Sequence, residues 1–288
     1  MPIFIGDTRN HRIQVFDLDG TFLRKWGSQG SGDGQFQYPS RVFASGGEVF
    51  VCDDENFRIQ VFDLEGVFQR KWGSYGTGNG QFIYANGITV FAAEVFVTDD
   101  GNNRIQVFDL DGTFLRKWGS YGTGDGQLKA PNENDIYKGE IFVADESNHR
   151  IQVFDLDGTF LRKWGSYGTG DGKFNYPYGI SVFKDEVFTT EIYNYRVQVF
   201  DLEGTFLRKW GSYGTGDGKF DQPQGIRATS KEVFVVDRLN SRLQVFDLEG
   251  TFLRKWGSYG TGDGKFRYPI GCDIPAGKIQ YLPIMGVG

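Results

Sequence analysis

Six acidic side chains recur along the chain, and each precedes an arginine by five positions. A carboxylate could serve as a general base or a metal ligand, and a guanidinium could bind an anion. An active site normally occurs once in a molecule, so a set that recurs with every repeat favours a structural role instead. We expect each pair to meet across a turn that an intervening asparagine, Asn10 in the first, caps. The pairs are Asp7 and Arg12, Asp53 and Arg58, Asp99 and Arg104, Asp145 and Arg150, Glu191 and Arg196, and Asp237 and Arg242.

Two glycine-containing segments resemble ligand-binding loops without meeting their requirements. The stretch 211–219 has the glycines of a phosphate-binding loop, but Phe220 follows its lysine where a serine or threonine is needed. The stretch 17–20 lacks the spaced oxygen ligands and the final glutamate of a calcium loop. The sequence predicts a connection between strands for the first and a hairpin turn for the second.

A repeat of 46 residues, marked by one tryptophan in each copy, carries all of these motifs. Propeller blades and helical solenoids share this period, so the content of the repeat must decide between them. Arg58 to Asp63 and Val67 to Trp72 are rich in β-branched and aromatic residues and flank an acidic residue and a glycine, which indicates two strands joined by a hairpin. Glu48 to Asp53 and the segment near Arg41 to Ser45 add two more strands. Four short strands per repeat, a to d in chain order, predict an all-β, six-bladed β-propeller with four antiparallel strands per blade.

The two ends of the chain complete one blade between them. Pro2 to Asp7 align with strand b, so the first unit lacks strand a, and Ile270 to Ile274 supply it. This closure leaves no end blade uncovered. We therefore predict one propeller domain over residues 1–288, in which 276–288 form a C-terminal tail without an assigned place.

Residues 165–183 and 186–210 closely resemble the NHL-repeat consensus. The resemblance implies a propeller used for recognition of RNA or protein partners, and a minority of related six-bladed propellers are metal-dependent lyases or hydrolases. Some units depart from the consensus: Ala85 replaces a proline, Leu128 replaces the loop phenylalanine, and residues 132–135 replace the usual start of strand a.

Composition narrows the class of protein further. The net charge of -6 disfavours a nucleic-acid partner, and no apolar run reaches the roughly 18 residues of a membrane-spanning helix. No signal peptide is visible at the start, and Cys52 and Cys272 are expected to be buried free thiols. These features favour a soluble, cytoplasmic chain without a membrane partner.

The histidines and the aspartates of strand a are the remaining candidates for chemistry. His11 and His149 are three repeats apart, so they lie on opposite sides of a six-fold ring and cannot share a metal ion. Asp135 and Asp273 are also three repeats apart, but strand a lines the central channel, where they could face one another with Arg227 nearby. Solvated channel polarity is the preferred interpretation, and a bound ion is the alternative. We predict no catalytic residue, no metal and no cofactor.

Variation between repeats locates a binding surface. Strands c and d are nearly identical in all copies, whereas the loops between b and c and the entrances to strand a differ, and both emerge on one face of a propeller. Apolar and tyrosine side chains gathered there suggest a binding hot spot, although packing of these rings on the adjacent loop would also explain them. The predicted partner-binding residues are Tyr178, Ile192, Tyr193, Tyr195, Arg227, Arg238 and Leu239.

Charge is also sorted around the predicted ring. An acidic sector contains Asp54, Glu55, Asp100, Glu133, Asp135 and Glu146, and a basic sector contains Lys219, Arg227, Arg238, Lys265, Arg267, Arg9 and Arg41. A face with both signs suits a protein or peptide better than a polyphosphate, because the acidic half repels a strand that crosses it. The favoured function is a non-catalytic protein-binding scaffold with no small-molecule substrate. The alternatives are single-stranded RNA stacked on Tyr178 or Tyr193 and, last, a channel-centred metal-dependent hydrolase or lyase.

Overall fold

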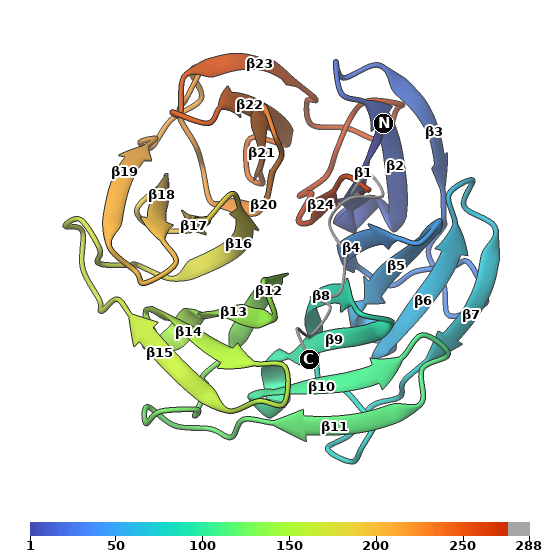
Figure 1. Ribbon diagram of the computed structural model, residues 1–288. Helices are drawn as coiled ribbons and strands as arrows, with labels where there is room; N and C mark the ends of the chain where they lie inside the picture. The colour runs from blue at the N-terminus through green and yellow to red at the C-terminus, as the bar shows by residue number, and fades with distance from the viewer. Residues whose placement is uncertain (276–288) are drawn as a thin grey trace, which may run out of the picture.

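The computed structural model describes residues 1–275, which form six four-stranded antiparallel sheets arranged in a ring (Figure 1). Strand a of each sheet lies at the centre and strand d at the rim, as predicted. The first blade contains β24 (Cys272–Asp273), β1 (Pro2–Asp7), β2 (Arg12–Asp17) and β3 (Phe22–Trp26), and the second contains β4 (Pro39–Ser45), β5 (Glu48–Asp53), β6 (Arg58–Asp63) and β7 (Phe68–Trp72). The third contains β8 (Ala85–Phe91), β9 (Glu94–Asp99), β10 (Arg104–Asp109) and β11 (Phe114–Trp118), and the fourth contains β12 (Pro131–Tyr137), β13 (Glu140–Asp145), β14 (Arg150–Asp155) and β15 (Phe160–Trp164). The fifth contains β16 (Pro177–Phe183), β17 (Glu186–Glu191), β18 (Arg196–Asp201) and β19 (Phe206–Trp210), and the sixth contains β20 (Pro223–Ala228), β21 (Glu232–Asp237), β22 (Arg242–Asp247) and β23 (Phe252–Trp256).

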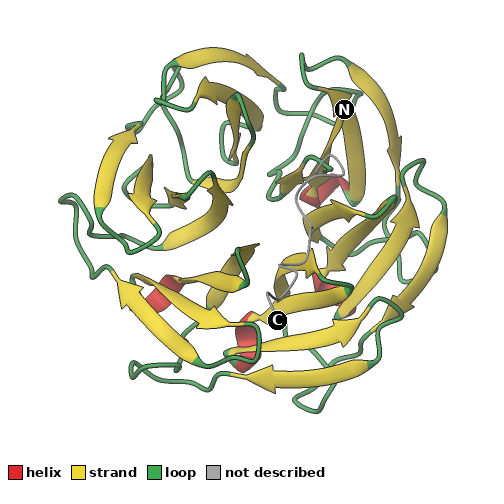
Figure 2. Ribbon diagram, in the orientation of Figure 1, coloured by secondary structure: helices red, strands yellow, loops and turns green. Residues whose placement is uncertain are grey.

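Helical structure within residues 1–275 is limited to single 3-10 turns between strands b and c of the first four blades (Figure 2). These turns are η1 (Thr8–Asn10), η2 (Asp54–Asn56), η3 (Asp100–Asn102) and η4 (Glu146–Asn148). No helix in this described part is long and apolar enough to cross a membrane.

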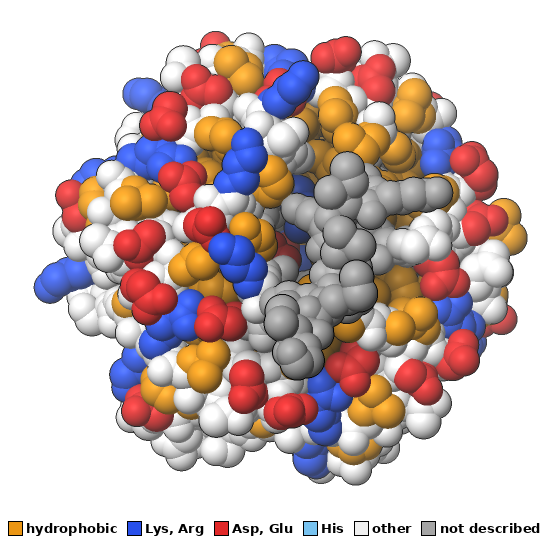
Figure 3. Space-filling view, in the orientation of Figure 1, with side chains coloured by type: hydrophobic (Ala, Val, Ile, Leu, Met, Phe, Trp, Pro, Cys, Tyr) orange, Lys and Arg blue, Asp and Glu red, His pale blue; other side chains and the backbone are white. Residues whose placement is uncertain are grey.

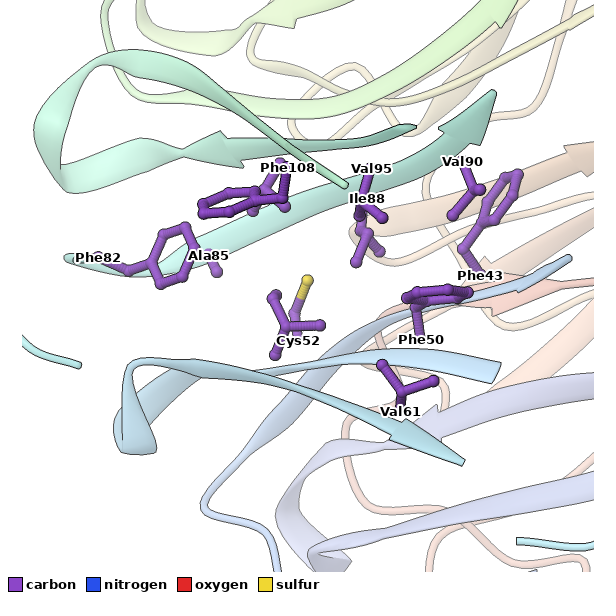
Figure 4. Close-up of a cluster of buried hydrophobic side chains, with 12 residues drawn as sticks. Phe43, Phe50, Cys52, Val61, Phe82, Ala85, Ile88, Val90, Val95 and Phe108 are labelled. Atoms are coloured by element: carbon purple, nitrogen blue, oxygen red, sulfur yellow. The ribbon is translucent and has the colours of Figure 1, made fainter. Parts of the chain in front are cut away.

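The hydrophobic core lies between neighbouring blades rather than within one. Figure 4 shows one of these layers, in which Phe50 and Cys52 of the second blade face Ile88 and Phe108 of the third. Strands b and c are buried along most of their length, whereas the outer strand d alternates half-buried and exposed residues. Both cysteines are buried free thiols, as predicted.

The closing contact of the ring matches the prediction from the chain ends. β24 pairs with β1 through Phe4 opposite Asp273 and Ile5 opposite Cys272. The other inner strands have six or seven residues, so β24 is the shortest of them. The proposed tail 276–288 and its possible strand at 278–282 lie outside the described residues.

Packing between the sixth and first blades repeats the packing between the other blades. The indole of Trp26 lies 2.6 Å from the place where a Cβ on Gly66 would stand, and Trp256 lies 2.7 Å from the equivalent place on Gly20. Gly66 also has a φ of +89°, so the hairpin needs glycine for both the backbone and the ring contact. In the same way, Arg254 donates to the carbonyl of Leu18 as Arg70 does to that of Leu110.

Candidate binding face and channel mouth

One face of the ring carries the loops from strand b to strand c and the glycine-rich loops from strand d to the next strand a. We call it the loop face. In the second blade, Arg58 Nε lies 2.7 Å from Asp53 Oδ2, and Asn56 donates to the same carboxylate. The two terminal nitrogens of Arg58 donate to three backbone carbonyls of the incoming loop, those of Ser31, Gly32 and Gln35. The arginine therefore fastens the loop of one blade to the next blade.

This arrangement, the arginine clamp, recurs in all six blades and confirms the structural interpretation of the acidic and arginine pairs. The acidic residue is fully buried in every blade, and the arginine side chain is 7–9% exposed. A glutamine adds two contacts that the sequence analysis missed: Gln60 donates to Gln35 O and accepts from the amide of Gly34. Such a residue could be found from its fixed place two positions after the arginine in every repeat.

Exposed tyrosines are the second repeated feature of the loop face. Five of them occupy the same position in successive glycine-rich loops and are between 61% and 67% exposed: Tyr75, Tyr121, Tyr167, Tyr213 and Tyr259. The sequence analysis missed them because their repetition resembled scaffold. An aromatic residue at the same place in five successive glycine-rich loops was the signal available in the sequence.

The fourth and fifth blades join these rings into an aromatic row. Ring centroids are separated by 5.0 Å between Tyr167 and His149, 4.7 Å between His149 and Tyr176, and 5.2 Å between Tyr176 and Tyr193. His149 Nδ1 accepts the backbone amide of Tyr176 at 3.2 Å, and burial lowers the pKa of this imidazole. The row therefore presents neutral aromatic surface that reaches from the rim of the loop face to Tyr193.

The predicted binding residues divide into exposed and buried groups. Tyr193 is 47% exposed and Leu239 is 37% exposed, whereas Tyr178 and Ile192 are only 8% and 7% exposed. Tyr195 is half-buried and packs on Tyr213 at 4.9 Å. Tyr178 and Ile192 are therefore not part of the exposed surface that was expected to include them.

The remaining predicted binding residues are arginines. Arg238 is half-buried and lies over the ring of Tyr268 at 5.4 Å, which places it on the loop face. Arg227 lies in the channel instead, with its side chain 12% exposed.

Ion pairs line the channel for which the sequence suggested solvated polarity. Arg227 bridges the two aspartates, with Nε 3.0 Å from Asp273 and Nη1 3.6 Å from Asp135. Asp273 accepts the backbone amide of Ala44 at 2.7 Å through its other oxygen, and the Asp135 oxygen that faces Arg227 also accepts the amide of Val182 at 2.8 Å. Burial raises the pKa of Asp273 to about 6 even though Arg227 opposes this shift. These groups lock the inner strands together.

A second channel pair changes the predicted charge sectors. Arg41 is 2% exposed and lies 3.2 Å from Glu133, and burial raises the pKa of this carboxyl to about 7. Arg41 and Arg227 thus neutralise channel carboxylates instead of belonging to a basic surface. Glu55 and Arg9, which remain on the loop face, lie in adjacent blades, the second and the first.

The mouth of the channel on the loop face is acidic. Asp54, Asp100 and Glu146 begin the loops between strands b and c in three consecutive blades. Burial raises the pKa of Asp100 to about 6 and that of Glu146 to about 7, and the charge of Asp100 adds to the shift of Glu146. Within residues 1–275, neither Asp100 nor Glu146 forms a salt bridge.

Neutralising the Glu146 carboxylate should make the fold more stable. We expect Glu146→Gln to raise the free energy of unfolding at pH 8 by about 1–3 kcal/mol, because a carboxyl whose folded pKa lies above its usual 4.5 opposes folding when ionised. The wild-type protein gains this stability itself as the pH falls from about 7 toward 4.5. Urea unfolding of both proteins at pH 8 and pH 4.5 measures the difference. An equal gain at both pH values would contradict the assigned cause.

In the described part of the chain, no three residues among His, Cys, Asp and Glu are placed to hold a metal ion. His11 and His149 lie in the first and fourth blades, and each Nδ1 accepts a backbone amide, that of Tyr38 or Tyr176.

On the face in Figure 3, acidic and basic side chains are interspersed around the ring with hydrophobic side chains among them.

Comparison with known proteins supports the repeat assignment. The family described as 6-bladed beta-propeller matches residues 33–118, and the NHL repeat matches residues 138–154. Protein brain tumor of Drosophila melanogaster is 50% identical over 40 residues, which are 14% of this chain and 4% of that protein. The chain therefore spans only a small part of that relative's length.

Solved structures support the architecture. A chain in the nidogen/laminin complex has a TM-score of 0.65 at 14% identity, with 94% of this chain and 97% of that chain covered. Virginiamycin B lyase from Staphylococcus aureus has a TM-score of 0.56 at 17% identity, with 76% and 69% covered. Likeness at this identity shows the fold alone. Together with the six sheets and their repeated loops, these matches show a six-bladed β-propeller that contains an NHL repeat.

Proposed function

We propose that this propeller is a non-catalytic scaffold that binds a protein or peptide on the loop face. The observation that carries the proposal is the aromatic row Tyr167, His149, Tyr176 and Tyr193, which continues the exposed ring of loop tyrosines. Rigid aromatic side chains supply contact area at a low entropic cost, and they are enriched in binding hot spots. The arginine clamps hold the loops that carry them, so the surface is preorganised.

The charges of the loop face support a protein partner over a polyanion. Half-buried carboxylates surround the channel mouth on the side of the second to fourth blades, and they would repel a nucleic-acid strand that crosses the axis. Arg9 and Arg238 lie on the opposite side, over the ring of Tyr268. A partner with both signs of charge fits this division.

Single-stranded RNA confined to that opposite side is the second candidate. The observation in its favour is the pairing of arginines with aromatic rings: Arg9 lies 4.6 Å from the Tyr268 ring centroid, and Arg267 lies 5.7 Å from that of Tyr259. Bases stack on such rings, and guanidinium groups bind phosphates. The NHL resemblance implies RNA or protein partners alike.

Substitution of Tyr193 and Tyr195 by alanine should abolish partner capture from a lysate of the native source. The exposed ring of Tyr193 and the half-buried ring of Tyr195 both lie on the loop face, and each supplies contact area that alanine cannot. Affinity capture followed by mass spectrometry, with and without RNase, measures the loss. A matched control is the pair Leu161→Ala and Leu207→Ala, which removes side chains of similar exposure from the outer strands.

Three outcomes separate the candidates. Capture that survives RNase and depends on the tyrosines supports a protein partner. Capture that RNase removes, with an affinity that falls steeply as salt rises, supports RNA. Unchanged capture by the tyrosine variant would count against both uses of this part of the loop face.

A further inference from the structure

The channel mouth on the loop face brings three carboxylates into one opening. The charge of Asp100 raises the pKa of Asp54 and of Glu146, so the three groups are close enough to repel one another. Beside burial, which is the largest cause, the charges of Glu146 and Asp54 raise the pKa of the Tyr178 phenol. Tyr178 lies on β16 of the fifth blade, and the three carboxylates belong to the second, third and fourth blades.

These carboxylates differ from the other buried acidic groups in their partners. Each acidic residue of the arginine clamps has an arginine, and the channel carboxylates share Arg41 and Arg227. Within residues 1–275, Asp100 and Glu146 have only amide donors, Asn86 at 2.8 Å for the first and Asn132 for the second. Asp54 differs from them, because the charge of Arg41 opposes the rise of its pKa. Repelling carboxylates without a cation, as at Asp100 and Glu146, cost stability, and such cost is typical of binding sites.

Unpartnered hydrogen-bond acceptors lie at the same level of the inner strands. The amide of Asn132, which is fully buried, contacts Glu146 through its nitrogen, and its Oδ1 has no hydrogen-bond partner in the described residues. Gln224, at the equivalent place on β20, is 5% exposed, and its Oε1 is also without a partner there. Carboxylate and amide oxygens only accept hydrogen bonds, so the lining calls for a group that only donates.

We propose that this mouth binds the side chain of a lysine or arginine presented by the peptide partner. Ammonium and guanidinium groups are the donor-only groups of proteins, and they would supply the positive partner that Asp100 and Glu146 lack within the described residues. The Tyr178 ring adds an aromatic surface that already holds one guanidinium, that of Arg41 at 4.9 Å. This inference rests on the proposed function, since it specifies what the partner places at the centre of the loop face.

The test uses fluorescein-labelled hexalysine, hexaserine and hexaglutamate with the full chain, by fluorescence anisotropy at pH 8. We expect hexalysine to bind the wild-type protein and to lose about tenfold or more in affinity with the double variant Asp100→Asn and Glu146→Gln. That variant should fold, because neutralising these groups relieves repulsion. The control Glu55→Gln and Glu65→Gln removes the same net charge from exposed positions and should change the affinity less than twofold.

Two results with the labelled peptides would overturn the inference. One is equal weakening by the mouth variant and the control, which would mean that hexalysine responds only to net charge. The other is hexalysine binding no tighter than hexaserine. If the natural partner is still captured by the mouth variant but not by the Tyr193 and Tyr195 variant, the proposed function stands and this inference fails.

Discussion

Arg58→Ala should lower the free energy of unfolding by about 3–5 kcal/mol, the cost of removing one partner from a buried ion pair. The substitution leaves Asp53 fully buried without its guanidinium and removes the donors to three backbone carbonyls. Each buried acceptor left without a partner adds to the loss. Urea unfolding followed by tryptophan fluorescence measures the change.

A surface ion pair of the same blade provides the control. Lys71 pairs with Asp33 at 2.5 Å, but both side chains are more than one third exposed, so Lys71→Ala should cost less than about 1 kcal/mol. A similar loss for the two variants would mean that the arginine clamp contributes no more than an ordinary surface pair. The loop that Arg58 holds also carries the incoming strand β4, so the variant should become more sensitive to proteases near residues 31–35.

A chain that ends at residue 268 should lose cooperative folding, or melt at least about 10 °C below a chain that ends at residue 275. The deleted segment contains β24, and its loss exposes the edge of β1 and the core against which Cys272 and Ile274 pack. It also removes Asp273, which holds Arg227 and the amide of Ala44.

Comparison of these two truncations keeps residues 276–288 out of the result, because both lack them. Thermal unfolding by circular dichroism and size-exclusion chromatography provide the measurements. Melting temperatures within about 2 °C of each other would show that the ring does not depend on β24 for its closure.

The bounds of the strands could be predicted closely because each strand can be compared with the equivalent strands of the other repeats. Glu48 to Asp53 and Arg58 to Asp63 form β5 and β6 with the predicted bounds. The outer strand begins at Phe68 rather than Val67, because Asp63 Oδ1 accepts the amide of Val67 and holds it in the turn. Strand a begins earlier than Arg41, at Pro39, with an irregular register that no local pattern announces.

The contacts and exposure of side chains on the loop face were harder to predict than the position of that face. The acidic partner of Arg58 could be inferred from a spacing of five residues, but its other partners are backbone carbonyls of the preceding loop, which carry no sequence signal. Tyr178 was predicted to be an exposed binding residue. Its exposure depends on the position of strand a within the ring, which could not be predicted from the sequence. Prediction of the ion pairs between Arg227 and the two aspartates would likewise require the diameter of the channel.

The interface between the sixth and first blades has a consequence for the order of the chain. Trp256 and Arg254 make the contacts to Gly20 and Leu18 that the equivalent residues make at interfaces without any interruption of the backbone nearby. Loop 257–271 connects these two blades as the equivalent loops connect the others, and the break in the strand order lies inside the first blade, between β24 and β1. All six interfaces between blades therefore have equivalent contacts. A circularly permuted chain shifted by whole repeats would meet the same set of interfaces.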